Sequence, residues 1–335
     1  MENIDLSLIW ALIVALGVIM YVLLDGFDLG LGILFPFAPD EDARDVMMNS
    51  IAPIWDGNET WLILGGVALI AAFPLVYTIL LPALYIGVFL MLAGLIFRGV
   101  AFEFRFKSAT QRARKLWGWS FFGGSLVASF AQGCVVGSYI QGYQTANDVY
   151  TGGAFDWLTP FAVLTGVGLA AGYALLGATW LVLKSEGAIQ VWARSLVNKL
   201  LLGVLAVFVL IGIWTPLMND VIADRWFSQI RVIWLLPLAA LLCALGVYHF
   251  NRRRRDLLPF LLTVGLFVFT YLGMVVSRWP LVVPPAYSFR DAASAPGSQF
   301  VVLVGVLIIL PVVLGYTAWS YWIFRGKVRV GEGYH

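Results

Sequence analysis

Two short acidic stretches hold the residues of this chain that are best suited to proton chemistry. They are Asp25-Gly26-Phe27-Asp28 and Trp55-Asp56-Gly57-Asn58-Glu59, and each adjoins a hydrophobic segment long enough to cross a membrane. A charged side chain at the centre of a membrane helix costs roughly 2.5–3.5 kcal/mol on insertion scales, and such residues commonly mark ion or proton pathways. These carboxyl groups therefore form the candidate chemical site.

The composition of the chain indicates an integral membrane protein. Of its 335 residues, 61% are hydrophobic and 12% are charged, whereas a water-soluble domain carries about 25% charged residues. The net charge of +2, without a basic stretch interleaved with aromatic residues, argues against nucleic-acid binding. Cys134 and Cys243 each lie in an apolar run, which predicts packing residues and no disulfide framework.

Apolar runs of about 20 residues, the length that crosses the hydrocarbon core as a helix, predict an all-α membrane protein with nine transmembrane helices bundled in a single domain over residues 1–335. The apolar character of the first run extends from Leu31 to Phe37, so its helix can continue past Gly32. Only Phe73-Pro74 separates the second run from the third. The expected spans are 6–25, 57–75, 77–103, 117–140, 158–183, 196–218, 229–250, 257–277 and 300–324.

Basic residues are distributed unevenly between the two sides of these spans. The loops that follow odd-numbered spans, together with the C-terminus, carry most of the 21 Lys and Arg residues. The opposite loops carry only Arg225, Arg231, Arg278 and Arg290. Because cytoplasmic loops of membrane proteins are enriched in Lys and Arg, the N-terminus is predicted outside (periplasmic) and the C-terminus in the cytoplasm.

This orientation places six ionisable side chains from three consecutive spans near the cytoplasmic surface: Asp25, Asp28, Asp56, Glu59, Arg98 and Glu103. The spacing of Gly26-xxx-Gly30 would allow a neighbouring helix to approach closely beside the aspartates. Gln132, within the fourth span, predicts a hydrogen bond between helices. The alternative interpretation is that the six are ordinary interfacial charges, with Arg98 neutralising one aspartate.

Residues that could ligate a metal or a haem are scarce. The two histidines, His249 and His335, have no His, Cys or Met partner at a suitable spacing. The sequence also contains no P-loop, dinucleotide fingerprint or HExxH motif. It therefore predicts no metal site, redox centre or nucleotide site in this chain.

Four strings give the chain a resemblance to a known family, subunit II of the cytochrome bd quinol oxidases. They are Leu24-Asp25-Gly26-Phe27-Asp28-Leu29-Gly30-Leu31-Gly32, Asn49-Ser50-Ile51-Ala52-Pro53-Ile54-Trp55-Asp56-Gly57-Asn58-Glu59-Thr60-Trp61-Leu62, Phe97-Arg98 with Phe102-Glu103-Phe104-Arg105, and Tyr316-Thr317-Ala318-Trp319-Ser320-Tyr321-Trp322. The resemblance covers the whole chain. Its short form is similar to the compact, cyanide-insensitive branch, because the outside segment near 219–231 is reduced.

The resemblance implies a subunit of a terminal respiratory oxidase in the bacterial cytoplasmic membrane, which oxidises quinol and reduces dioxygen to water. Haems b558, b595 and d would belong to the partner, subunit I, and this chain would ligate none. Charge separation would be electrogenic without proton pumping. The resemblance leaves open a structural quinone or lipid between helices and a small single-helix accessory subunit.

The family's functional positions fall on Asp28, Asp56 and Arg98, which the resemblance implies lie on a cytoplasmic proton-uptake path. Asp56 would be the entry and Asp28 the relay, joined by Asp25, Asn58 and Glu59. Arg98 and Glu103 would be charge partners that tune the pKa of these carboxyl groups. Trp55 and Trp61 would have a positioning role.

Two other functions remain open at this point. A proton-coupled secondary transporter also uses carboxyl groups within the membrane, although such proteins commonly contain inverted repeats and broken helices near the midplane, and this sequence shows no repeat. A non-catalytic scaffold would use the acidic groups only to dock a partner chain. The haem spectrum of whatever co-purifies distinguishes an oxidase subunit from a self-sufficient transporter.

Overall fold

The computed structural model describes residues 5–229 and 231–331, which are mostly helical. The α-helices are α1 (Leu6–Leu34), α2 (Glu41–Asn49), α3 (Trp55–Ala72), α4 (Pro74–Phe106), α5 (Gln111–Gln141), α6 (Pro160–Lys184), α7 (Gly187–Met218), α8 (Asp220–Asp224), α9 (Leu235–Arg252), α10 (Leu257–Arg278) and α11 (Pro296–Ile323). Short helical turns, η1 (Phe35–Phe37), η2 (Arg225–Gln229) and η3 (Arg231–Trp234), extend or join them. Two antiparallel hairpins pair β1 (Thr145–Ala146) with β2 (Val149–Tyr150), and β3 (Leu281–Val283) with β4 (Tyr287–Ser288).

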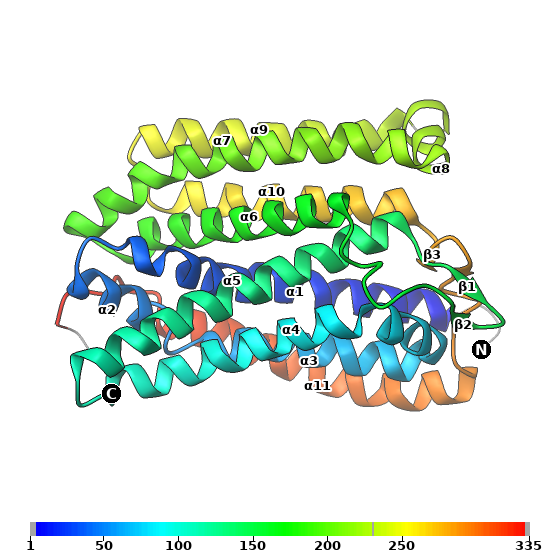
Figure 1. Ribbon diagram of the computed structural model, residues 1–335, viewed down its shortest axis with the longest axis horizontal. Helices are drawn as coiled ribbons and strands as arrows, with labels where there is room; N and C mark the ends of the chain where they lie inside the picture. The colour runs from blue at the N-terminus through cyan, green and yellow to red at the C-terminus, as the bar shows by residue number, and fades with distance from the viewer. Residues whose placement is uncertain (1–4, 230, 332–335) are drawn as a thin grey trace.

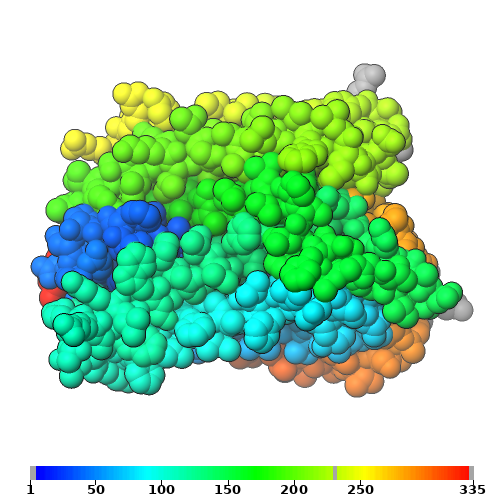
Figure 2. Space-filling view, viewed as in Figure 1, coloured from blue at the N-terminus to red at the C-terminus, as the bar shows by residue number. Residues whose placement is uncertain are grey.

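The long helices lie side by side along the longest dimension of the molecule (Figure 1). Both hairpins lie at the end where the N-terminus is found, and α2 lies at the opposite end with the C-terminus. In the space-filling view, α4 and α5 cover the lower part of the near face and α7 to α9 form its upper edge (Figure 2). The two ends of the helical bundle thus differ, with the hairpins at one and α2 at the other.

Eight of the helices in the described part of the chain are long and apolar enough to cross a membrane. The expected second span, 57–75, folds as α3 but is not among the eight, because its first turns contain Asp56, Asn58 and Glu59. The first span is longer than its predicted range 6–25, since α1 continues to Leu34 as its apolar sequence allowed. The structure therefore supports an all-α membrane protein with eight candidate spans and a more polar α3.

Two pairs of glycines allow the helices around the acidic residues to touch. A Cβ atom on Gly30 of α1 would lie 1.8 Å from the carbonyl oxygen of Tyr173 in α6, and one on Gly177 would lie 2.6 Å from the carbonyl carbon of Gly30. Gly94 of α4 and Gly124 of α5 form the same kind of contact. A Cβ atom on Gly94 would lie 2.6 Å from the carbonyl oxygen of Gly124, and one on Gly124 would lie 2.4 Å from that of Gly94. The close approach predicted beside Gly26-xxx-Gly30 is thus confirmed.

The end of α11 is fixed to α6 by a buried lysine. The Lys184 ammonium group donates hydrogen bonds to the carbonyl oxygens of Phe324 and Gly326, the second at 2.7 Å. The backbone N–H of Val328 donates to the carbonyl oxygen of Lys184 at 2.7 Å. A cation at a helix C-terminus is favourable because the last carbonyl groups carry partial negative charge. This contact holds the final turns of α11, including Tyr321, against the bundle.

The contact between α1 and α6 gives a first prediction. Gly30→Ala should lower the free energy of unfolding by about 1–3 kcal/mol or more, because the added methyl group overpacks a backbone contact. Gly65→Ala on α3 is the matched control, since a Cβ atom there meets nothing within 4 Å. Thermal unfolding of the purified protein would show a lower Tm for Gly30→Ala alone. Equal shifts for both variants would contradict the close approach.

Candidate functional site

Arg98 of α4 joins two acidic residues from different helices in the interior of the bundle. Its guanidinium group is 0% exposed and forms an ion pair through Nη1 with Oδ1 of Asp25, which is also fully buried. Nη2 lies 3.0 Å from Oε2 of Glu59, whose side chain is 27% exposed. The cluster therefore connects α1, α3 and α4 and reaches solvent-accessible surface only at Glu59.

A second arm of the site begins at Asp28, three residues after Asp25 on the same face of α1. Nδ2 of Asn58 donates a hydrogen bond of 2.8 Å to Oδ2 of Asp28. The hydroxyl group of Tyr321 in α11 donates to Oδ1 of Asn58, also at 2.8 Å. Asp28 and Asn58 are both buried, and the other oxygen of Asp28, Oδ1, has no hydrogen-bond partner among the described residues.

A third arm extends toward the N-terminal end of α1. Tyr21 lies one turn before Asp25 on α1 and so shares its helix face. Nε2 of Gln132 donates to the Tyr21 hydroxyl at 2.7 Å, and the hydroxyl of Tyr173 donates to Oε1 of Gln132 at 2.9 Å. The hydrogen bond between helices predicted for Gln132 is confirmed. All three side chains are buried, so the chain of polar groups continues into the bundle.

The remaining predicted residues lie around this cluster in different ways. Trp55 stacks on Phe102 with ring centroids 5.0 Å apart, and the Arg98 guanidinium lies 5.9 Å from its ring centre. Trp61 is buried. Asp56 is exposed on α3, and Glu103 is exposed and pairs with Lys107 at 2.7 Å. The structure thus brings together Asp25, Asp28, Asn58, Glu59 and Arg98, with Trp55 beside them, and leaves Asp56 and Glu103 outside.

Three tyrosines belong to this network and were not among the predicted site residues. Tyr21 had a local signal, because it lies four residues before Asp25 and so shares its helix face. Tyr173 had none, since its partner Gln132 is far away in the sequence. Tyr321 lies in the string 316–322 that carries the family resemblance, but nothing in that string pairs it with Asn58.

His249, the histidine within the described residues, joins no metal site. His249 is exposed and packs edge-on against Phe250, and His335 lies outside the described residues. Over residues 5–229 and 231–331, no group of three or more His, Cys, Asp or Glu residues is arranged to hold a metal ion.

A separate ion-pair network fixes α2 across the end of the bundle. Nη1 of Arg105 lies 2.6 Å from Oδ1 of Asp45, and Nη2 lies 2.9 Å from Oε2 of Glu41. Arg114 of α5 donates to Oδ1 of Asp45 at 2.6 Å. Burial tends to raise the pKa of Asp45, but the hydrogen bonds from Arg114 and Arg105 outweigh it and leave this pKa below the ordinary value of 3.8. Both arginines thus stabilise the charged form of Asp45.

Comparisons with known proteins find relatives that match nearly the whole chain. A family model described as cytochrome bd terminal oxidase subunit II matches residues 6–324. Cytochrome bd-I ubiquinol oxidase subunit 2 of Escherichia coli (strain K12) is 31% identical over 360 residues, covering 96% of this chain and 95% of the relative. Cytochrome bd ubiquinol oxidase subunit 2 of Bacillus subtilis (strain 168) is 31% identical over 333 residues, covering 97% of each. A solved structure, bd oxidase from Geobacillus thermodenitrificans, shares the fold with a TM-score of 0.78 at 16% identity, covering 96% of this chain and 99% of that one.

The buried ion pairs of Arg98 give a second prediction. Arg98→Gln should lower the free energy of unfolding by about 3–5 kcal/mol, because it leaves buried carboxylates without their cation. Glu103→Gln is the control, since the exposed pair with Lys107 contributes little. Chemical denaturation of the two variants measures the difference. Similar losses would show that the Arg98 pairs have no special role in stability.

The low pKa of Asp45 gives a third prediction. The contribution of its ion pairs is fully present well above pH 3.8, the ordinary value, and is lost as the pH falls through the lowered pKa of the folded state. Asp45→Asn should therefore be less stable than the parent near neutral pH, and this difference should shrink in acid. Tm measured from pH 7 to pH 3 tests this, and a constant difference would contradict it.

Proposed function

Because the chain belongs to the cytochrome bd terminal oxidase subunit II family, we propose that it works beside a haem-bearing subunit I in an enzyme that oxidises quinol and reduces dioxygen to water. The Escherichia coli and Bacillus subtilis relatives are named as subunits of ubiquinol oxidases. Like them, this chain is a multi-pass protein of the bacterial inner membrane. The transporter alternative receives no support from these relatives.

We further propose that the cluster around Arg98 takes up the protons consumed when water is formed. The observation that carries this proposal is that Asp25 and Glu59 pair with one guanidinium group, while the buried carboxyl group of Asp28 accepts a hydrogen bond from the neutral Asn58 amide. One cation neutralises one carboxylate, and unpaired charge is costly in a dry interior. The other carboxyl groups are therefore well suited to bind and release protons.

The three arms suggest a direction for proton transfer. Glu59 is the acidic member of the cluster that reaches accessible surface, so a proton would enter there, with exposed Asp56 collecting protons nearby. It would pass to Asp25 and then toward the hydroxyl groups of Tyr21 and Tyr173, while the Gln132 amide holds these hydroxyls in line. Asp28, held by Asn58, would store a second proton. Arg98 would balance the charge without itself changing protonation.

The proposed source of the protons is the cytoplasm. Basic residues of α2, of the last turn of α4 and of the 252–255 run between α9 and α10 lie at the end of the bundle opposite the hairpins (Figure 1), and basic residues favour the cytoplasmic side. The cluster lies in the half of α1, α3 and α4 nearer that end. Helix α1 begins at one end of the bundle and α11 finishes at the other (Figure 1), which requires an odd number of crossings, so we include α3 as the ninth. Uptake from this side would make turnover electrogenic without pumping.

A fourth prediction tests the path in the assembled oxidase. Glu59→Gln should slow oxygen consumption and membrane-potential formation in proteoliposomes by about tenfold or more, as loss of a proton-transferring group commonly does. Asp56→Asn should slow turnover less, because Asp56 is exposed and water can replace its carboxyl group. Glu103→Gln should match the parent.

The haem spectrum separates a proton path from a scaffold. If the cluster is a proton path, the Glu59→Gln variant should retain all three haem signals while the pH profile of its turnover changes. If the haem signals and turnover fall together, the acidic cluster serves to assemble the complex. Normal electrogenic turnover in an assembled Glu59→Gln variant would remove Glu59 from the path.

A further inference from the structure

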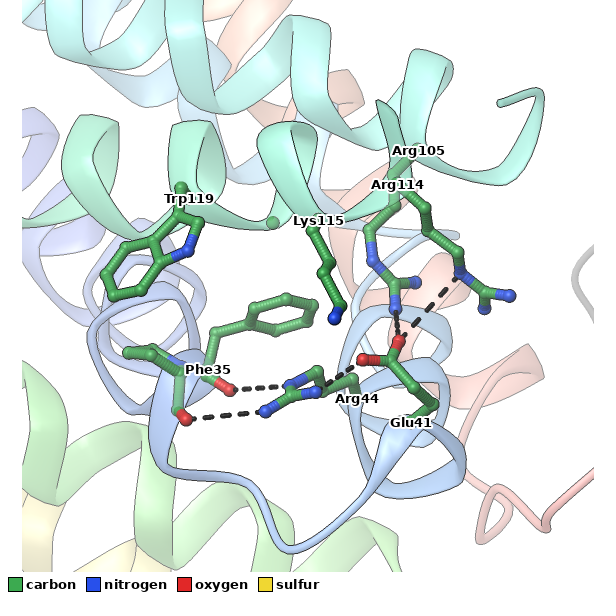
Figure 3. A pocket seen from close by; sticks show the side chains of 9 residues that line it. Phe35, Glu41, Arg44, Arg105, Arg114, Lys115 and Trp119 are labelled. Atoms are coloured by element: carbon green, nitrogen blue, oxygen red, sulfur yellow. Dashed lines mark hydrogen bonds and ion pairs between the residues drawn. The ribbon is translucent and has the colours of Figure 1, made fainter. Parts of the chain in front are cut away.

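A cavity of about 270 Å³ lies where η1, α4 and α5 meet beside α2, separate from the cluster around Arg98. Its lining residues are Phe35, Pro36, Glu41, Arg44, Arg105, Arg114, Lys115, Gly118 and Trp119. Figure 3 shows Trp119 at one side of the cavity and Arg105, Arg114 and Glu41 at the other, with the ring of Phe35 and the Lys115 side chain between them. The cavity thus has a polar half and an apolar half at the end of the bundle proposed to be cytoplasmic.

Positive charge exceeds negative charge in the polar half. Arg44 and Arg105 both pair with Glu41, the only carboxylate among the lining residues. Arg105 and Arg114 also pair with Asp45. Asp42 is the third carboxylate nearby and acts on Arg114 from a distance. Even with it included, there are four cations for three carboxylates: Arg44, Arg105, Arg114 and Lys115 against Glu41, Asp42 and Asp45. An anion would find an unneutralised charge here.

Lys115 carries that excess charge. Its side chain is exposed, it has no ion pair or hydrogen bond with any described residue, and its ammonium group points into the cavity (Figure 3). It belongs to the N-terminal turns of α5, whose first turn contains no acidic residue. The positive end of a helix dipole disfavours cations and attracts anions. A bound anion would therefore relieve the repulsion between this helix end and the side chains of Lys115 and Arg114.

The apolar half continues onto a surface of exposed aromatic rings. Trp119 is 61% exposed, and its ring centroid lies 5.6 Å from that of Phe122. Phe122 in turn contacts Phe37, which is 64% exposed, with centroids 6.5 Å apart. Tryptophan rings such as that of Trp119 gather at the level of lipid headgroups. The cavity therefore opens beside a surface that suits the membrane interface.

We propose that this cavity is a binding site for a phosphate-bearing anion, held by Lys115 and Arg114 with Arg44 and Arg105 behind them. A phosphodiester headgroup of an anionic lipid and soluble phosphate share this chemistry. Basic pockets between helices at the cytoplasmic end bind lipid headgroups in other membrane proteins, and the aromatic half would contact the glycerol and upper acyl chains. This site does not depend on the proton path.

The experiment compares two cations of α5 that differ in their relation to the cavity. Lys115→Gln removes the cation that points into it, whereas Arg112→Gln removes an exposed cation that is not among the lining residues. The assembled, delipidated complex would be titrated with phosphatidylglycerol, phosphatidylcholine or inorganic phosphate, and native mass spectrometry and Tm would report binding. Lys115→Arg keeps the charge and controls for side-chain effects.

The outcomes identify the source of the anion or overturn the site. For a lipid, phosphatidylglycerol should bind more tightly than phosphatidylcholine, and Lys115→Gln should weaken that binding about fivefold, as expected for one basic residue near an anionic surface. Arg112→Gln and Lys115→Arg should bind like the parent. For soluble phosphate, inorganic phosphate should raise the Tm of every protein except Lys115→Gln. If Lys115→Gln and Arg112→Gln respond alike to all three probes, the proposal is wrong.

Discussion

The burial of the Arg98 guanidinium determines how the helices around it must be arranged. Removing a guanidinium and a carboxylate from water costs several kcal/mol for each ion, and their attraction offsets this only when the geometry is good and further hydrogen bonds are made. Arg98 meets this demand by pairing with Asp25 of α1 and Glu59 of α3. Three helices must therefore converge at one level of the bundle.

The glycine contacts make that convergence possible. A Cβ atom on Gly124 would lie 2.9 Å from the backbone nitrogen of Arg98, so α5 presses directly against the segment that carries the arginine. The contact between Gly30 and Gly177 lies half a turn beyond Asp28 and brings α6 against α1. Where side chains are absent the backbones touch, and the interhelical space that remains is filled by the charged groups and the tyrosines. Packing and electrostatics thus specify the same arrangement.

How much of this could be predicted from the sequence depends on whether the signal is local. The long apolar runs gave the helices, and the spacing of Asp25 and Asp28 gave their common face. Helical periodicity also separates Arg98 from Glu103, because five residues turn a helix by about 140°, and Glu103 instead meets Lys107 one turn later. It likewise turns Asp56 about 200° away from Asn58. These angles could be calculated from the sequence alone. The hydrogen bond between Tyr321 and Asn58 could not be predicted in this way, because it requires α11 to pack against α3, and no local sequence pattern encodes that packing.

The two arginines of α4 connect the buried cluster to the ion-pair network of α2. Arg98 and Arg105 are seven residues apart, about two turns, and so lie on nearly the same face. Arg105 is engaged by Asp45 and Glu41 of α2, and this holds α2 across the end of the bundle with Met47 and Met48 fully buried beneath it. The end of the bundle near α2 is therefore closed above the cluster. The partly exposed Glu59, at the beginning of α3, is the carboxyl group of this ion-pair cluster that reaches accessible surface, and this is why we propose that protons enter at α3.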